Sequence, residues 1–240
     1  MFPHIVFLLA VILLASNIQG SLAVDYTVTN NAASTAGGAR FVRDIGPDYT
    51  RQTASSATDF IWRVFQQTNP TDRKNVQKVS IFIDVMDGVA YAVNNEIHIS
   101  NNYIGNYSGN VKTEITGVLY HEMTHIWQWN GNGQAPGGLI EGIADFVRLK
   151  ANYGPSHWVQ PGQGDRWDQG YDVTARFLDY CNSLRNGFVA ELNKKMRSGY
   201  RLIALSTLLI CSGRMLISSG VSTRPSMDSR GDLAYGLMPN

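Results

Sequence analysis

The stretch that most constrains this chain is His121-Glu122-Met123-Thr124-His125, an HExxH pattern. If the stretch is helical, its two histidines stand on one face with Cβ atoms about 5–6 Å apart. Both imidazoles can then reach one metal ion, and Glu122 lies beside them, able to take a proton from an activated water. This is the ligand-and-base arrangement of a zinc hydrolase, so the pattern predicts a fold organised around a Zn²⁺-binding helix.

The sequence around the motif has the period of an amphipathic helix, which we expect from Glu114 to about Trp129. Two neighbouring stripes run along it. The first is apolar and predicted to face the core: Ile115, Leu119, Met123 and Ile126. The second contains the motif and is predicted to face a cleft: Val118, His121, Glu122 and His125. A glycine-rich segment over 131–133 predicts the end of the helix.

A second, very apolar helix is expected to begin at Leu139 and to end before Gly154. It carries two acids, Glu141 and Asp145, in a sequence otherwise suited to burial. Buried carboxylates are rarely left unpaired. A metal ion and a histidine would satisfy both, so this helix is predicted to contribute to the same site.

Two segments resemble the plant basic secretory protein family: HEMTHIWQWNGNGQAPGGLIEGIADFVRLKA from His121, and GYDVTARFLDYCNSL from Gly170. The resemblance covers about residues 24–200. It implies a zincin-like metallopeptidase of plant defence that hydrolyses peptide or protein substrates. The implied fold is α/β (α+β), with a mixed sheet, a cleft-lining edge strand and an HExxH active-site helix.

The resemblance also bears on the third metal ligand. In the thermolysin-like zincins, which Glu141-x-x-x-Asp145 resembles, the first acid binds zinc and the second bonds the first histidine. The longer Glu141 side chain can cross a gap between helices, while a carboxylate bonded to an imidazole fixes its tautomer. Asp145 stays open as the alternative ligand, since Gly142 would let the helices approach closely enough for a shorter side chain.

The implied roles follow from this ligand set. Zinc would be held by His121, His125 and Glu141, with Glu122 as general base. A hydrogen-bond donor to the developing oxyanion is required, and Tyr171 and Tyr153 are the candidates from their positions. Either tyrosine has packing as its alternative role.

Upstream of the motif, alternating or continuous apolar runs predict strands over 25–29, 79–85, 89–93 and 96–100, with a helix over 50–68 and a surface loop over 30–38. In zincins the strand just before the motif helix edges the cleft and pairs with substrate by strand addition. The strand over 96–100 resembles it by position. His98 is expected to be an exposed strand residue and not a ligand. Downstream, helices are predicted from Tyr171 and over 188–196.

The first 23 residues are predicted to be a signal peptide, because an apolar run over 2–15 is followed by a cleavage site before Val24. The mature chain would then be secreted to the apoplast or cell wall. Its formal net charge is only +1, from 20 Lys+Arg against 19 Asp+Glu, which argues against nucleic-acid or membrane partners. We expect a monomer, glycosylated at Asn106 in the sequon Asn106-Tyr107-Ser108.

The catalytic domain is predicted over residues 24–200, and residues 201–240 form an atypical tail. From Arg201 the helical and strand periods are lost, and we interpret the tail as a shifted reading frame or an alternative splice product. With 2 Cys in the chain there is no disulfide framework, although Cys181 and Cys211 could pair. The alternative functions are a non-catalytic secreted defence or carbohydrate-binding protein with a structural zinc, or an inactive truncated variant.

Overall fold

The computed structural model describes residues 24–200, 226–227 and 233–234. The predicted signal peptide, most of the tail and Cys211 therefore lie outside the described residues. Contacts divide the chain into two compact units, Met1–Trp127 with Lys150–Pro155 and Gln128–Leu149 with Ser156–Asn240. The strands of the first unit are β1 (Asp25–Asn30), β2 (Lys78–Asp84), β3 (Ala90–Val93) and β4 (Glu96–Ser100). Its helices are α2 (Ala36–Asp44), α3 (Pro47–Val64), η1 (Pro70–Asp72), α4 (Asn101–Asn106) and α5 (Val111–Trp127). The second unit contains α6 (Gly137–Lys150), α7 (Tyr171–Leu184) and α8 (Phe188–Met196), and the tail contributes β5 (Ser226–Met227) and β6 (Leu233–Ala234).

The first unit is built on a four-stranded mixed sheet in the order β1-β2-β4-β3. β2 pairs in parallel with both β1 and β4, and β3 is antiparallel to β4. The fully buried apolar residues of the two inner strands are β-branched and alternate with less buried ones: Val79, Ile81, Ile83, Ile97 and Ile99. An α+β fold with a mixed sheet was predicted, and both are confirmed.

The prediction that the strand over 96–100 forms the cleft-lining edge is wrong. β4 lies between β2 and β3, and the edge strand on that side is β3. The cause is the Asn94-Asn95 turn, in which both residues adopt positive φ, 50° and 62°. Such a two-residue turn folds β3 back onto β4 as a hairpin and leaves the other side of β4 to pair with β2.

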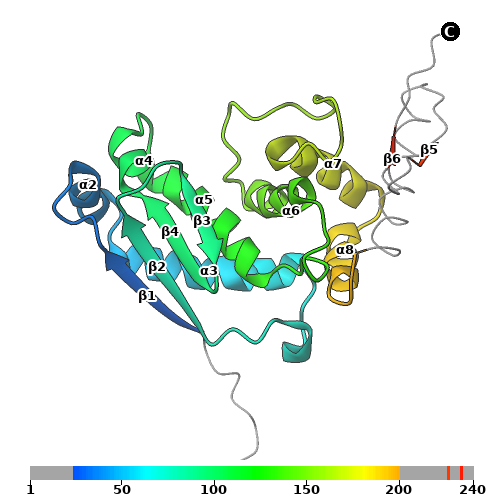
Figure 1. The fold of residues 1–240 in the computed structure, drawn as a ribbon, viewed down its shortest axis with the longest axis horizontal. Coiled ribbons are helices and arrows are strands. Elements are labelled where there is room, and N and C mark those ends of the chain that lie inside the picture. Colours follow the sequence, from blue (N-terminus) through cyan, green and yellow to red (C-terminus); the bar gives the residue numbers. More distant parts are fainter. Residues whose placement is uncertain (1–23, 201–225, 228–232, 235–240) are drawn as a thin grey trace, which may run out of the picture. The chain divides into compact units, whose positions relative to one another are not determined.

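Helices α3 and α5 pack against the sheet, α3 beside β1 and α5 beside β3. Figure 1 shows α3 passing behind the strands. The predicted core-facing stripe of the motif helix is confirmed, because these residues are all buried: Ile115, Leu119, Met123 and Ile126. The motif helix is therefore fixed by its apolar face within the first unit.

His98 lies on the face of β4 opposite to that of Ile97 and Ile99. The prediction that its side chain is exposed is wrong. Only 17% of its side chain is accessible. Its ring is stacked between Phe82 and Tyr91, at centroid distances of 5.0 and 4.7 Å, and Nδ1 lies 2.6 Å from a carboxylate oxygen of Asp84. Cross-strand pairing of β2, β4 and β3 places the Phe82 and Tyr91 rings on either side of the imidazole, so that they cover it.

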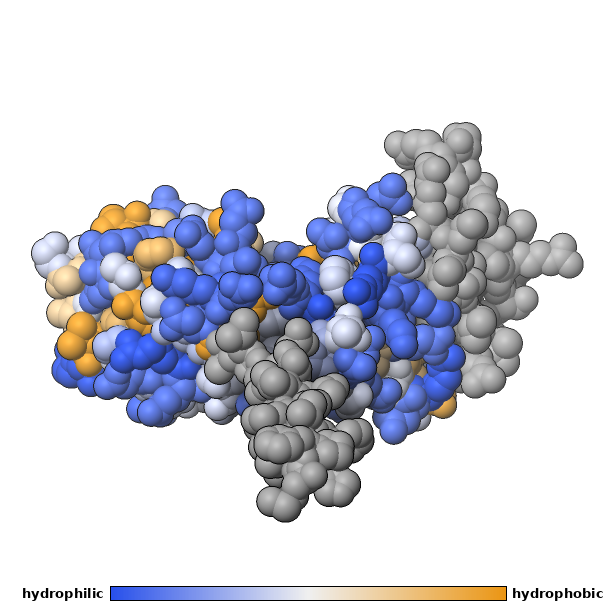
Figure 2. All heavy atoms as spheres, turned by 90° about the horizontal axis from the view of Figure 1, so that it is seen from below, coloured by the Kyte–Doolittle hydropathy of each residue, from blue (hydrophilic) through white to orange (hydrophobic). Residues whose placement is uncertain are grey.

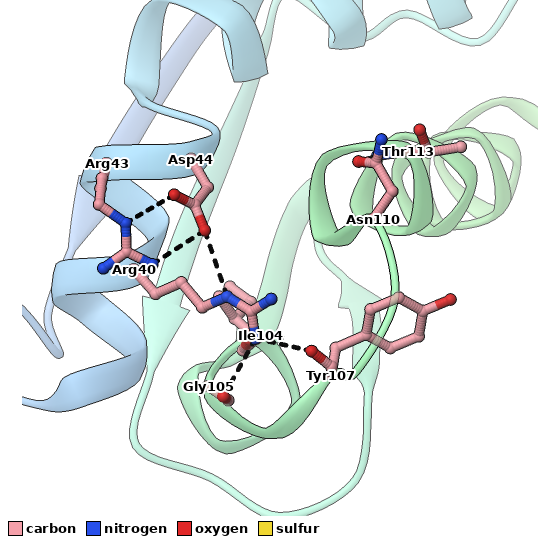
Figure 3. A network of polar contacts seen from close by, with 8 residues as sticks. All are labelled: Arg40, Arg43, Asp44, Ile104, Gly105, Tyr107, Asn110 and Thr113. Carbon is pink, nitrogen blue, oxygen red and sulfur yellow. Dashed lines mark hydrogen bonds and ion pairs between the residues drawn. The ribbon is translucent and has the colours of Figure 1, made fainter.

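Helices α2 and α4 are joined through the Arg40 guanidinium (Figure 3). Its Nη1 donates to the carbonyl oxygens of Ile104, Gly105 and Tyr107, at 2.9, 3.1 and 2.7 Å, and its Nε donates to Asp44 at 3.2 Å. The last carbonyls of a helix have no partner within the helix. Arg40 therefore supplies the donors that the C-terminal end of α4 needs.

The second unit is a group of three helices with a long irregular segment between α6 and α7. Fully buried residues from all three helices form its core: Leu139, Ile143, Val147, Leu178 and Leu192. Cys181, buried on α7, is disulfide-bonded. The chain that follows α5 is tied to α8, because Trp129 N donates to Asn193 Oδ1 at 2.8 Å.

The surface of the first unit mixes apolar and polar side chains. Its exposed large apolar residues are Val42, Val85, Val89, Tyr91 and Val93. Figure 2 shows apolar side chains in orange, on the left, set among hydrophilic ones in blue. Within the described residues, we find no helix with the length and apolar character needed to cross a bilayer.

Candidate metal centre

Helix α5, which carries the HExxH motif, is anchored by polar contacts at both ends. Near its start, buried Glu114 accepts a hydrogen bond from Tyr103 Oη at 2.8 Å. At its end, Trp127 Nε1 donates to Thr58 Oγ1 at 3.1 Å, and Tyr26 Oη donates to the same hydroxyl at 2.7 Å. Contacts at both ends, together with the buried stripe, hold the motif residues in a fixed position.

His121 and His125 converge on one point. They are one helical turn apart on α5, and their Nε2 atoms lie 3.0 Å apart. Two Zn–N bonds of about 2.0–2.1 Å can join nitrogens up to about 4 Å apart. The imidazole pair therefore fits a single zinc ion without a change of helix geometry.

Glu122 is buried on the same helix, between the two histidines in sequence. The neighbouring turn is regular, with Thr124 Oγ1 donating back to the carbonyl oxygen of Tyr120 at 2.7 Å. A buried carboxylate is costly unless a partner charge or donor compensates it. A carboxylate on the same helix as two ligand-type imidazoles has the chemistry that a general base in a metal site requires.

The two acids of the predicted second motif helix lie on α6, one turn apart. Asp145 is buried and Glu141 is partly accessible. Among the described residues, His121, His125 and Glu141 form a group that could hold a metal ion, with ligand atoms within 4.8 Å of one another. Two imidazoles and one carboxylate are the donor set of many catalytic zinc sites.

Gly142 lies in close contact with helix α7. A Cβ at this position would lie 2.2 Å from Thr174 Cγ2 and 2.3 Å from Thr174 Cβ. The close approach made possible by Gly142 is thus to α7 of the same unit. Glu141 belongs to the metal-capable group, and Asp145 stays open as the alternative ligand.

The structure separates the two candidate tyrosines. Tyr153 belongs to the first unit and is half-buried, with its ring 5.2 Å from that of Tyr120. Burial, with a smaller contribution from Tyr153, raises the pKa of Tyr120. Tyr171 begins α7 with φ of 46°, and 58% of the residue is exposed. Tyr153 packs against a neighbour, whereas Tyr171 is presented to solvent in a strained conformation.

Comparisons with known proteins identify the family of this chain. A sequence model of the family described as "Peptidase of plants and bacteria" (BSP) matches residues 21–216, well over half of the 240 residues. A "Basic secretory protease" of Boswellia serrata is 79% identical over 29 residues, which are 12% of this chain and 45% of that relative. The chain thus matches less than half the length of this curated relative, and no solved structure matches. Because the family match spans most of the chain, the protein belongs to the peptidases of plants and bacteria, the basic secretory protein family.

Proposed function

We propose that this protein is a secreted zinc-dependent metalloendopeptidase. The observation that carries the proposal is the His121, His125 and Glu141 group, with Glu122 between its two histidines, in a chain of a peptidase family. A purely structural zinc site has no need of an acid between its ligands and is usually closed by a fourth protein ligand. The residue set therefore favours catalysis over a structural role.

The proposed ligands are His121, His125 and Glu141, with Asp145 orienting a histidine. Bound there, zinc would supply Lewis-acid chemistry, acidifying water and polarising the scissile carbonyl. Asp145 is buried one turn from Glu141, which suits a carboxylate that bonds an imidazole and fixes its tautomer. We retain Glu141 as the ligand because its longer side chain belongs to the metal-capable group.

Glu122 is assigned the proton transfers. Its carboxylate takes a proton from the attacking water as the new C–O bond forms. It returns that proton to the amine nitrogen as the peptide C–N bond breaks. Burial of Glu122 on the helix that carries both imidazoles suits this role.

Tyr171 is assigned as the donor to the developing oxyanion. A phenol can donate one hydrogen bond, and a donor aimed at the oxyanion is the usual requirement in acyl transfer. Two observations favour Tyr171 over Tyr153. Tyr171 is exposed and has an unfavourable backbone conformation, whereas Tyr153 packs against Tyr120.

Secretion, defence and glycosylation complete the proposal. The name of the matched relative, a basic secretory protease, supports export, and the residues that precede Val24 would direct it. We assign a monomeric protein of the apoplast or cell wall that acts on peptides or proteins in plant defence. Asn106 is the exposed last residue of α4, a position that can accept a glycan without disturbing the core.

The test is hydrolysis of casein by the purified mature protein and by Glu122→Gln. Gln keeps the side-chain shape and both histidine ligands but cannot take a proton. Loss of a general base typically lowers the rate by 10²–10⁴-fold. We expect that loss with zinc content unchanged, and we expect a chelator to abolish the wild-type activity.

Glu96→Gln, a matched change of a partly exposed residue at the start of β4, should leave the rate of casein hydrolysis unchanged. Wild-type rates in Glu122→Gln would remove Glu122 from the mechanism. Absence of chelator-sensitive hydrolysis in the wild type would refute the proposed function as a whole.

A further inference from the structure

Two glycines of α6 are in close contact with the segment just before α7 and with α7 itself. A Cβ at Gly138 would lie 2.1 Å from the carbonyl oxygen of Asp168 and 3.2 Å from Gly170 N. A Cβ at Gly142, one turn later, would overlap the side chain of Thr174. The helix that carries Glu141 is therefore held directly against the start of the helix that carries Tyr171.

Thr174 provides the polar half of this contact. It is fully buried, and its Oγ1 accepts a hydrogen bond from Gly170 N at 2.8 Å and donates one to the carbonyl oxygen of Trp167 at 2.7 Å. Both partners lie in the segment just before α7. One hydroxyl thus fixes the chain on the N-terminal side of Tyr171.

The conformation that Thr174 fixes is unfavourable for a residue with a side chain. Gly170 has φ of 103° and Tyr171 has φ of 46°. Glycine adopts positive φ readily, but a bulky residue does so only when the surrounding structure imposes it. The hydrogen bond from Gly170 N to Thr174 Oγ1 holds the backbone directly before Tyr171.

We propose that Thr174 is a positioning residue, whose hydroxyl holds Gly170 and Tyr171 so that the Tyr171 phenol is presented beside the Glu141-bearing helix. The inference rests on the proposed peptidase function and extends it to a residue with no direct contact to substrate. Thr174 acts through the backbone, and its methyl group fills the space over Gly142. The sequence alone does not suggest this role, because a threonine in the first turn of a helix is commonly a local backbone partner.

Two substitutions separate the hydroxyl from packing. Thr174→Val keeps the shape and removes the hydroxyl, while Thr174→Ser keeps the hydroxyl and removes the methyl. A misplacement of about 1 Å in a catalytic group can cost about 10²-fold in rate. We therefore expect kcat for casein hydrolysis to fall about 10–100-fold in Thr174→Val, with KM and zinc content within about twofold. Thr174→Ser should stay within about threefold.

The control is Thr50→Val on α3, which removes another buried hydroxyl, bonded to the carbonyl oxygen of Gly46 at 2.9 Å. It should leave kcat unchanged. Equal losses in Thr174→Val and Thr174→Ser would mean that packing alone matters, and the proposal would be overturned. A fall in zinc content that matches the fall in kcat would overturn it as well, because the effect would then be on the metal site.

A double-mutant cycle with Tyr171→Phe tests whether Thr174 acts through Tyr171. If it does, Thr174→Val adds no further loss of kcat in the Tyr171→Phe background. Independent, additive losses would contradict the proposal. Amide hydrogen exchange of Gly170 reports on its hydrogen bond to Thr174 independently of any activity assay. Protection of this amide should fall at least tenfold in Thr174→Val and persist in Thr174→Ser. Unchanged protection of the Gly170 amide in Thr174→Val would refute the positioning role of Thr174. A wild-type protein with no more hydrolysis than Glu122→Gln would instead refute the proposed peptidase function.

Discussion

Replacing Gly142 with alanine should move α6 away from α7. The added Cβ would lie 2.2 Å from Thr174 Cγ2, whereas carbon atoms in contact are about 3.5–4.0 Å apart. The two helices must therefore separate by about 1.3 Å or more at this point, or Thr174 must leave its position. Overpacking of this kind costs about 1–3 kcal/mol. At about 2–4 °C per kcal/mol for a chain of this size, Tm should fall by about 2–12 °C.

The displacement should also reach the metal site, because Glu141 is the residue before Gly142. We expect zinc affinity to fall by about 10–100-fold, the range seen when the groups that hold a ligand in place are lost. Gly137→Ala is the matched control, since nothing lies within 4 Å of a Cβ at that position of the same helix. Calorimetric melting and zinc titration of both variants make the test. A Gly142→Ala variant as stable and as zinc-avid as Gly137→Ala would refute the close-contact reasoning.

Two further predictions concern parts of the chain outside the site. Arg40→Met should lower the free energy of unfolding by about 1–3 kcal/mol, because three carbonyl oxygens lose their shared donor. Arg43→Met, on the same helix but exposed, should change it by less than about 0.5 kcal/mol, and equal urea midpoints for the two variants would contradict this difference. The hydrogen bond from Lys195 is the main cause that lowers the pKa of Glu191. Because its pKa is lower in the folded state, the ionised Glu191 carboxylate stabilises the fold. This stabilisation is present above the unfolded pKa of about 4.5 and is lost as the pH falls through the lower folded pKa. Glu191→Gln should therefore lower the urea midpoint at pH 7 but not near pH 2, and an equal loss at both values would contradict it.

Local patterns predict most of the first unit. The period of the motif helix, the alternation in β4 and the apolar run of β2 each reflect one buried face, so they can be read without knowing the partner. Helix α2 was missed, because 30–38 is small and polar and the helix begins inside it, at Ala36. Its start depends on Thr35, whose Oγ1 accepts from Gly38 N at 3.0 Å, a cap easily taken for a loop residue.

Contacts between distant segments were harder to predict. β3 is the edge strand because it pairs with one side of β4 while β2 pairs with the other side. The sequence of a single strand does not show which neighbour pairs with each of its two sides. Burial of His98 likewise depends on Phe82 and Tyr91 from two other strands. Gly142 was recognised as a point of close approach, but the sequence could not say which helix approaches it. The metal-capable group could be predicted because metal binding requires particular residue types at a particular spacing, and both are visible in the sequence.

The measurement that tests the central claim most directly is a zinc titration of the apo-protein and of two variants, Glu141→Ala and Asp145→Ala. We predict one zinc per wild-type chain and almost no binding in Glu141→Ala, because a ligand is lost. Asp145→Ala should bind about 10–100-fold more weakly, as expected when a carboxylate that orients a histidine is removed. The reverse order of the two variants would move the ligand to Asp145, and a wild type that binds no zinc would contradict the account.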